Sequence, residues 1–382
     1  HRRGSFFIAG TGEPDPAGPW PEPAGRPIEL PEPMAPKPWN VPSDFDTPMI
    51  GESEGLKLLE SLGRELASEL PGARLLRAVL EDGSSEGEVI SSRGLRARLR
   101  HRVASLYLEA AGPAPSGRPA ATATLYLYAR EARRFHPPAL ARRLADRLAV
   151  AAAGAPPPGP DAAECLLAPP VMARLLAGLL PLLVGPQSTA YLSGRRDRRG
   201  KIGSDLLTLL DNGRLQGGAF ESPVDGEGVP CSEVVLVEEG SYRQPLLAWW
   251  QESAAPGTPS GCSRRASWRD IPAPGPTHLY LKPDARTPVA ALLGAVERGY
   301  YLLDATGGAR FDFGADRFAL PVCGFAVAGG RAQAPVAGAW LCGGIGTLLH
   351  GIRAVGRDLA FHPLDGMIGT PTVLVTGLEL RG

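Results

Sequence analysis

The spacing of apolar residues changes between the start and the middle of the N-terminal third, and this change dictates the fold class. Up to Leu70 the leucines recur at helical steps of three and four, and Pro71–Gly72 ends the pattern; they are Leu56, Leu59, Leu62, Leu66 and Leu70. From Arg93 the period becomes two, with Leu95, Ala97, Leu99 and Val103 alternating with Arg96, Arg98, Arg100 and Arg102. Residues 121–128 alternate in the same way. These periods predict a helix followed by two amphipathic strands.

A second helix is predicted over 138–152, where Leu140, Leu144 and Leu148 share one face. Gly154 and the prolines from Pro156 end it. We therefore predict an N-terminal α+β domain over residues 1–155. The chain enters directly into an expected strand at Ser5–Gly10, so this domain is expected to be incomplete at its start, with a Pro-rich connection at 13–48.

Strand and turn patterns dominate after residue 156. Short strands are predicted at 232–238, 278–281, 324–328, 336–341 and 372–375. Helices are predicted at 170–183 and 345–355. The fold class is therefore α+β, with a mostly antiparallel, barrel-like C-terminal domain over 156–382 that holds a few helices.

Composition argues against several classes of function. Lys plus Arg and Asp plus Glu both number 40, so the net charge is zero and gives no reason to expect nucleic acid as a partner. The apolar run from Leu166 to Gly185 contains Arg174 and three prolines, which favours a buried helix over a membrane span. Five scattered cysteines without CxxC spacing indicate a reducing, cytoplasmic location.

The sequence contains no recognisable catalytic set. Its six histidines show no HExxH, HxH or HxxE spacing, and no GxSxG or P-loop pattern occurs. The arginines at 96, 98, 100 and 102 could bind carboxylates or phosphates, but the solvated face of a half-buried sheet is the favoured interpretation. Cys323 and Cys342 lie in apolar strands and are interpreted as buried, unreactive thiols.

The order of motifs in the C-terminal half is more specific. The succession is Asp211–Arg214, Gly217–Gly218, Ser222–Pro230, Glu239–Gly240, Ser260–Ser267, Gly324–Val327, Ala334–Val336, Ile352–Leu359 and Ile368–Val375. This succession resembles the TldD/PmbA family, whose members are described as modulators of DNA gyrase and as metallopeptidases. The resemblance is clear over about 165–382 and rests on element order alone over 53–160.

The resemblance implies a subunit without a metal site of its own. Catalytic TldD-type members carry HExxxH on a helix, and a cysteine from the C-terminal region completes the zinc site. In this sequence Ala177, Gly178 and Leu182 stand where the His, Glu and His would be, and Pro181 would distort the helix. The cysteine-bearing segment is missing between Phe361 and Gly366. A TldE-like subunit is therefore expected.

By the same resemblance, a TldD-like catalytic subunit would supply zinc in a heterodimer that encloses a chamber for unfolded peptides or leader segments of peptide precursors. Gly217, Gly218, Arg264 and Arg265 are candidates for lining that chamber, although the same residues could simply hold the fold. Two alternatives remain at this stage. One is an autonomous homodimeric peptide-binding or scaffold protein without proteolytic activity, and the other is a metal-independent hydrolase using Cys323 or Cys342.

Overall fold

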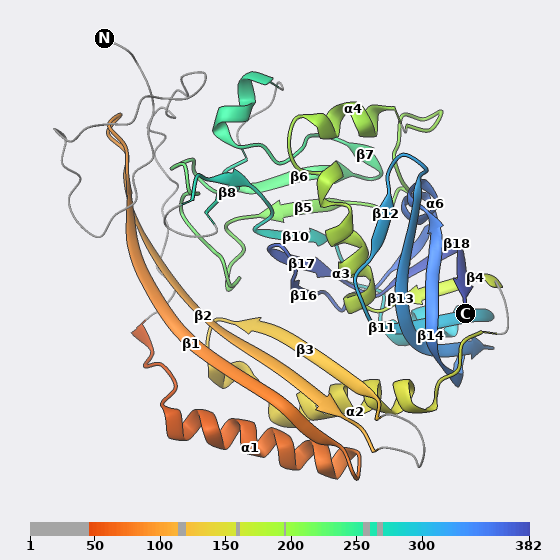
Figure 1. Cartoon of the computed structure of the whole chain (residues 1–382). Coiled ribbons are helices and arrows are strands. Elements are labelled where there is room, and N and C mark those ends of the chain that lie inside the picture. The colour runs from red at the N-terminus through yellow and green to blue at the C-terminus, as the bar shows by residue number, and fades with distance from the viewer. Residues whose placement is uncertain (1–45, 114–119, 158–160, 195, 255–259, 266–269) are drawn as a thin grey trace.

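A computed structural model describes residues 46–113, 120–157, 161–194, 196–254, 260–265 and 270–382 (Figure 1). The expected strand Ser5–Gly10 and all but the last three residues of the 13–48 connection lie outside these residues. No helix in the described ranges is long and apolar enough to cross a membrane.

The N-terminal unit is a three-stranded antiparallel sheet with two helices on one face (Figure 1). Its elements are α1 (Glu52–Glu69), β1 (Arg74–Ile90), β2 (Arg96–Ala111), β3 (Thr122–Ala129) and α2 (Pro137–Ala153). Leu62 and Leu66 of α1 pack with Leu106 of β2 and Leu144 of α2 in a core from which water is excluded. The two predicted helices and the two predicted strands are thus confirmed.

Strand β1 was not predicted, because its sequence lacks a sustained alternation and contains Gly83 and Gly87. It is held instead by β2, which it pairs antiparallel from Arg74 opposite Ala111 to Ile90 opposite Arg96, with one register shift between Leu75 and Arg77. The far part of this hairpin extends beyond the helices toward the C-terminal unit (Figure 1). There Leu95 and Ala97 pack against Val224.

The pairing with β1 corrects the interpretation of the arginine face. Arg96 and Arg98 are exposed and pair with Glu88 and Glu86 across the hairpin, as a solvated face would. Arg102 is only 2% exposed; its Nη2 lies 3.3 Å from Oδ2 of Asp82. The solvated-face interpretation was therefore wrong for Arg102, because the chain leading into α1 covers it and accepts its hydrogen bonds at the Thr47 and Pro48 carbonyls.

A closed five-stranded β-barrel forms the centre of the C-terminal unit. Its strands follow the order β11 (Arg298–Ala305), β4 (Asp161–Leu167), β18 (Val373–Arg381), β14 (Arg331–Gly344) and β13 (Arg317–Ala328), and β13 pairs β11 to close the ring. Only the β11–β4 pairing is parallel. The predicted barrel-like fold is confirmed. Outside the ring, β12 (Arg310–Asp312) pairs β13 and β15 (Ile352–Val355) pairs β18.

A six-stranded sheet lies beside the barrel. Its order is β16 (Ala360–Pro363), β17 (Met367–Thr370), β10 (His278–Leu281), β5 (Leu209–Asn212), β6 (Glu233–Glu238) and β7 (Ser241–Tyr242). Smaller elements are α4 (Gln187–Ser193), α5 (Val289–Gly294), the pair β8 (Ser263–Arg264) and β9 (Ala273–Pro274), and the 3-10 helices η2 (Ala132–Arg134) and η4 (Trp249–Ala254). Strand β16 therefore forms an edge of this sheet, as β3 does of the first.

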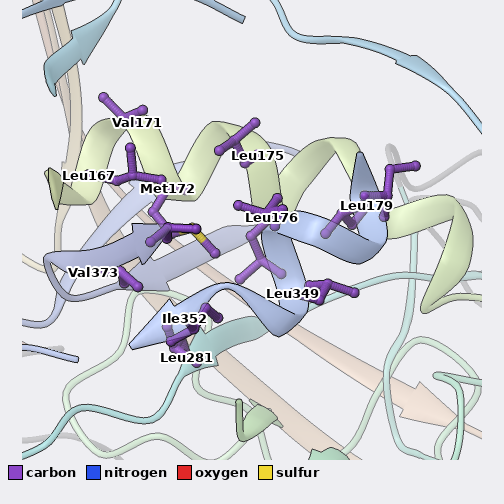
Figure 2. Packing of buried hydrophobic residues seen from close by; sticks show 14 of the residues in the cluster. Leu167, Val171, Met172, Leu175, Leu176, Leu179, Leu281, Leu349, Ile352 and Val373 are labelled. Carbon is purple, nitrogen blue, oxygen red and sulfur yellow. The ribbon is translucent and has the colours of Figure 1, made fainter. Parts of the chain in front are cut away.

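Helix α3 (Pro169–Gly178) lies between the barrel and the second sheet and supplies much of their shared core. Its buried side chains, among them Met172 and Leu176, pack with Leu281, Ile352 and Val373 (Figure 2). The helix is shorter than the predicted 170–183, because the proline at 181 allows only the 3-10 turn η3 (Leu180–Leu182) to follow.

Helix α6 (Ile345–His350) is also shorter than predicted. Gly351 ends it, and Ile352 begins strand β15 instead of a further helical turn. The apolar residues at 345–352 fit helical spacing, but backbone pairing with β18 decides the conformation from Ile352 onward.

Candidate functional site

The positions of the expected HExxxH motif are occupied by packing residues. Ala177 packs against the barrel core and Leu182 is buried in it. A Cβ added at Gly178 would lie 2.0 Å from Cε2 of Phe311, so the ring occupies the space beside the helix. Phe311 is itself stacked between Phe313 and Phe318, with ring centroids 5.7 and 5.9 Å away.

These positions supply no ligand for a metal. Across the part of the chain that the structure describes, no group of three or more His, Cys, Asp or Glu side chains could hold a metal ion. A zinc site requires three or four such ligands around one point. The residues present at the end of α3 therefore do not fit a zinc ion.

Two of the four predicted chamber residues lie together around Phe220. The Arg264 guanidinium stands over the Phe220 ring, 5.1 Å from its centroid. A side chain at Gly218 would collide with His278, whose ring is 6.2 Å from that of Phe220. The preceding residue, Gly217, adopts a φ of +76°, which glycine tolerates best.

Arg265 points elsewhere, in contrast to its neighbour. Its Nη1 donates to the carbonyl of Asp270 at 2.6 Å, and its Nη2 donates to the carbonyl of Gly226 at 3.4 Å. Arg265 thus holds a loop, which corresponds to the structural role that the sequence left open for these residues.

His278 is fixed as a neutral ring. Its Nδ1 donates to the carbonyl of Asn212 at 3.0 Å, and its Nε2 accepts the Phe220 amide at 3.3 Å. Burial is the main cause that lowers the pKa of His278 to about 4; the nearby Arg264 acts in the same direction, and the hydrogen bond to Asn212 opposes it. His278 therefore positions the Phe220 loop, and its ring stays neutral near pH 7 with its one proton donated to the Asn212 carbonyl.

A row of aromatic rings connects the two sheets through this cluster. Successive centroids are 5.2 to 6.3 Å apart along Tyr107, Tyr126, Tyr128, Phe220, His278, Phe361 and Tyr280. Tyr126 and Tyr128 lie on the face of β3 opposite the helices, and Tyr126 is 44% exposed. The alternation at 121–128 could have shown that these tyrosines share one face, but only the fold brings Phe220 to Tyr128 and Phe361 to His278.

Buried carboxylates hold the loops that surround the row. Asp225 Oδ1 accepts the amides of Glu227 and Val229 at 2.9 Å, and its Oδ2 accepts the amide of Ser263. Burial raises the pKa of Asp225 to about 7 and that of Asp211, which accepts the Thr277 amide, to about 6. Several residues of the recognised motifs thus act as loop braces.

The two candidate thiols are poor nucleophiles. Burial raises the pKa of Cys323 to about 11, and burial also raises the pKa of Cys342. Since the thiolate is the reactive form, both would be protonated near neutral pH. This disfavours the cysteine-hydrolase hypothesis.

The closed barrel, its adjoining sheet and the packed end of α3 together define an α+β protein. The family model described as PmbA/TldA metallopeptidase C-terminal domain matches residues 160–382. This match covers more than half of the chain, and the chain belongs to this metallopeptidase-related family.

Known relatives support the same assignment. The chain is 26% identical over 170 residues to a metalloprotease TldD homolog of Buchnera aphidicola, covering 44% of this chain and 35% of that protein. A TldD homolog of Haemophilus influenzae is 26% identical over 187 residues, covering 44% and 38%. The chain thus spans little more than a third of the curated relatives it matches.

Among solved structures, TldE from Thermococcus kodakarensis superposes with a TM-score of 0.80 at 18% identity, covering 94% of this chain and 81% of that one. At this identity the likeness establishes the fold.

Proposed function

We propose that this chain is the non-catalytic, TldE-like subunit of a heterodimeric metallopeptidase and that it helps to hold unfolded peptides for a TldD-like partner. The observation that carries the proposal is the end of α3, where Phe311 fills the space beside Gly178 and no ligand set is present among the described residues. A catalytic member would need two histidines and a glutamate on this helix. Zinc would then be held by the partner.

The aromatic row supports a role in holding peptides. Aromatic side chains offer large apolar contact area at low cost in side-chain entropy, so they suit substrates of varied sequence. The edge strands β3 and β16 lie near each other at the row, and edges can take up an extended chain through backbone hydrogen bonds. Leader segments of peptide precursors and small unstructured proteins are substrates of this kind.

The direct test is reconstitution with a TldD-like homologue that contains HExxxH. Peptidase activity on an unfolded peptide should require both chains, and zinc should be found in the partner alone by metal analysis. Stoichiometric zinc in this chain, or cleavage by this chain alone, would contradict the proposal. A stable homodimer that binds peptide and ignores the partner would favour the scaffold alternative instead.

A variant of the row tests the peptide-holding role separately. Phe220→Leu should raise KM for an unfolded peptide in the reconstituted pair, because the ring that joins the two sheets is removed. Trp250→Leu is a suitable control, since this exposed tryptophan lies outside the row. Equal KM values for the two variants would argue against a role for the row.

A further inference from the structure

Three arginines and one carboxylate gather where α2, α3, β11 and β16 meet. The arginines are Arg143 and Arg147 of α2 and Arg174 of α3. Nε of Arg147 lies 3.1 Å from Oδ2 of Asp304, and its Nη1 donates to the Thr124 carbonyl at 2.7 Å. All three guanidiniums lie within electrostatic range of Asp304 and so oppose the rise in its pKa that burial causes.

The cluster carries an excess of positive charge. Three guanidiniums and one carboxylate give 3 − 1 = +2. Within the described ranges neither Arg143 nor Arg174 takes part in an ion pair, and burial lowers the pKa of Arg143, with Arg147 adding to the effect. Partly buried like charges repel one another, and an anion between them would relieve the repulsion.

His362 adds an unused polar atom to the same place. Its Nε2 is buried and has no hydrogen-bond partner among the described residues. The neighbouring Phe361 faces the aromatic row, so the alternation of β16 turns His362 the opposite way, toward the arginines. Burial and the three arginines lower the pKa of His362 to about 3, which keeps the ring neutral. A neutral imidazole can donate from Nε2 to an anion without adding charge.

The surroundings favour a carboxylate at the end of an extended chain. Strand β16 forms the edge of its sheet, β3 forms the edge of the other, and the two lie in contact. Arg147 reaches the backbone of β3 through Thr124, so the charged cluster lies at the place where these edges meet. A peptide paired to such an edge is held along its backbone, and its terminal carboxylate suits planar guanidinium donors.

We propose that Arg143, Arg174 and His362 form a binding site for the C-terminal carboxylate of an extended peptide, with Arg147 held in place by Asp304. The site would fix the end of the substrate within the peptide-holding surface proposed above, on which this inference rests. The carboxylate site would give α3 a role in binding substrate, although the helix has no HExxxH ligands.

The test compares one short unstructured peptide with a free C-terminal carboxylate and the same peptide with a C-terminal amide. Binding is measured by fluorescence anisotropy on the full chain alone and on the reconstituted pair. The free acid should bind about tenfold more tightly, which corresponds to ~1.4 kcal/mol. Arg174→Gln and Arg143→Gln should each remove most of this preference while leaving amide binding unchanged.

Arg142→Gln is the matched control. Arg142 neighbours Arg143 on α2, but its side chain is 68% exposed and pairs with Glu69 on the other side of the helix. This variant should keep the preference for the free acid. Melting temperatures of the three variants check that each one folds.

Equal binding of acid and amide, on the chain and on the pair, would overturn the inference. Competition by inorganic phosphate as strong as that by the free-acid peptide would also overturn it, since a general anion site would then be present. The proposed function can fail while this inference holds: cleavage would then not require both chains, yet the free-acid peptide would still bind more tightly than the amide.

Discussion

Substitution of Gly178 by alanine tests whether the end of α3 is a packed contact. The added Cβ would meet three atoms of the Phe311 ring at 2.0 to 2.7 Å. Real Cβ atoms do not approach other atoms this closely, so the ring or the helix must move. Phe311 cannot move freely, because it stacks on both Phe313 and Phe318. We therefore expect Gly178→Ala to destabilise the protein.

The magnitude follows from two opposing effects. Overpacking of a core contact costs ~1–3 kcal/mol. Alanine gains up to ~1 kcal/mol over glycine inside a helix, and less at its last residue. The net loss should be about 1–2 kcal/mol, which lowers the melting temperature by roughly 2–8 °C for a domain of this size.

A thermal unfolding series with a double-mutant cycle measures this effect. Gly294→Ala is the matched control, since Gly294 is also the last residue of its helix and its added Cβ would meet nothing within 4 Å. In a Phe311→Ala background, Gly178→Ala should no longer destabilise. If Gly178→Ala alone is as stable as the wild type, or its cost persists without the ring, the packed-contact explanation is wrong.

Three further predictions concern buried charge, pH and thiol chemistry. Arg102→Leu should lower the free energy of unfolding, measured in urea, by about 3–5 kcal/mol because it leaves Asp82 buried without its ion-pair partner. Arg96→Leu removes an exposed ion pair and should lower it by less than ~1 kcal/mol. Similar losses for the two variants would refute this reasoning. The folded-state pKa of Asp225 is raised from 3.8 to about 7, so its contribution to stability is complete below pH 3.8 and is lost as pH rises through about 7. The wild type should therefore lose stability relative to Asp225→Asn between pH 3.8 and about 7. A stability difference that stays constant over this pH range would contradict the assignment. Cys323→Ser and Cys342→Ser should leave the peptidase activity of the reconstituted pair unchanged, and loss of activity in either would revive the cysteine hypothesis.

The sequence predicted those elements whose own periodicity is strong. Helices α1 and α2 and the alternation in β2 and β3 could be read from apolar spacing, because one face of each element is buried, and the short apolar run of β10 could be read because it is buried on both faces. Strand β1 could not be read in this way, since its polar and glycine-rich half is stabilised by pairing with β2. Helix α6 was predicted too long because residues from Ile352 onward pair with β18.

The candidate site shows the same division. The absence of ligands at Ala177, Gly178 and Leu182, the proline after α3 and the shared face of the two tyrosines in β3 are all visible in the sequence. The order of the C-terminal motifs was sufficient to indicate the family. These features are local, so residue type and spacing determine them.

The tertiary structure alone decided which distant residues meet. It placed Phe311 against Gly178, Phe220 between Tyr128 and His278, and His362 beside the arginines of α2 and α3. It also separated Arg264 from Arg265 and buried Arg102 within a face that otherwise resembles a solvated one. These contacts, and the charges that they bring together, depend on packing between segments far apart in the chain. The local spacing of residues therefore cannot predict them.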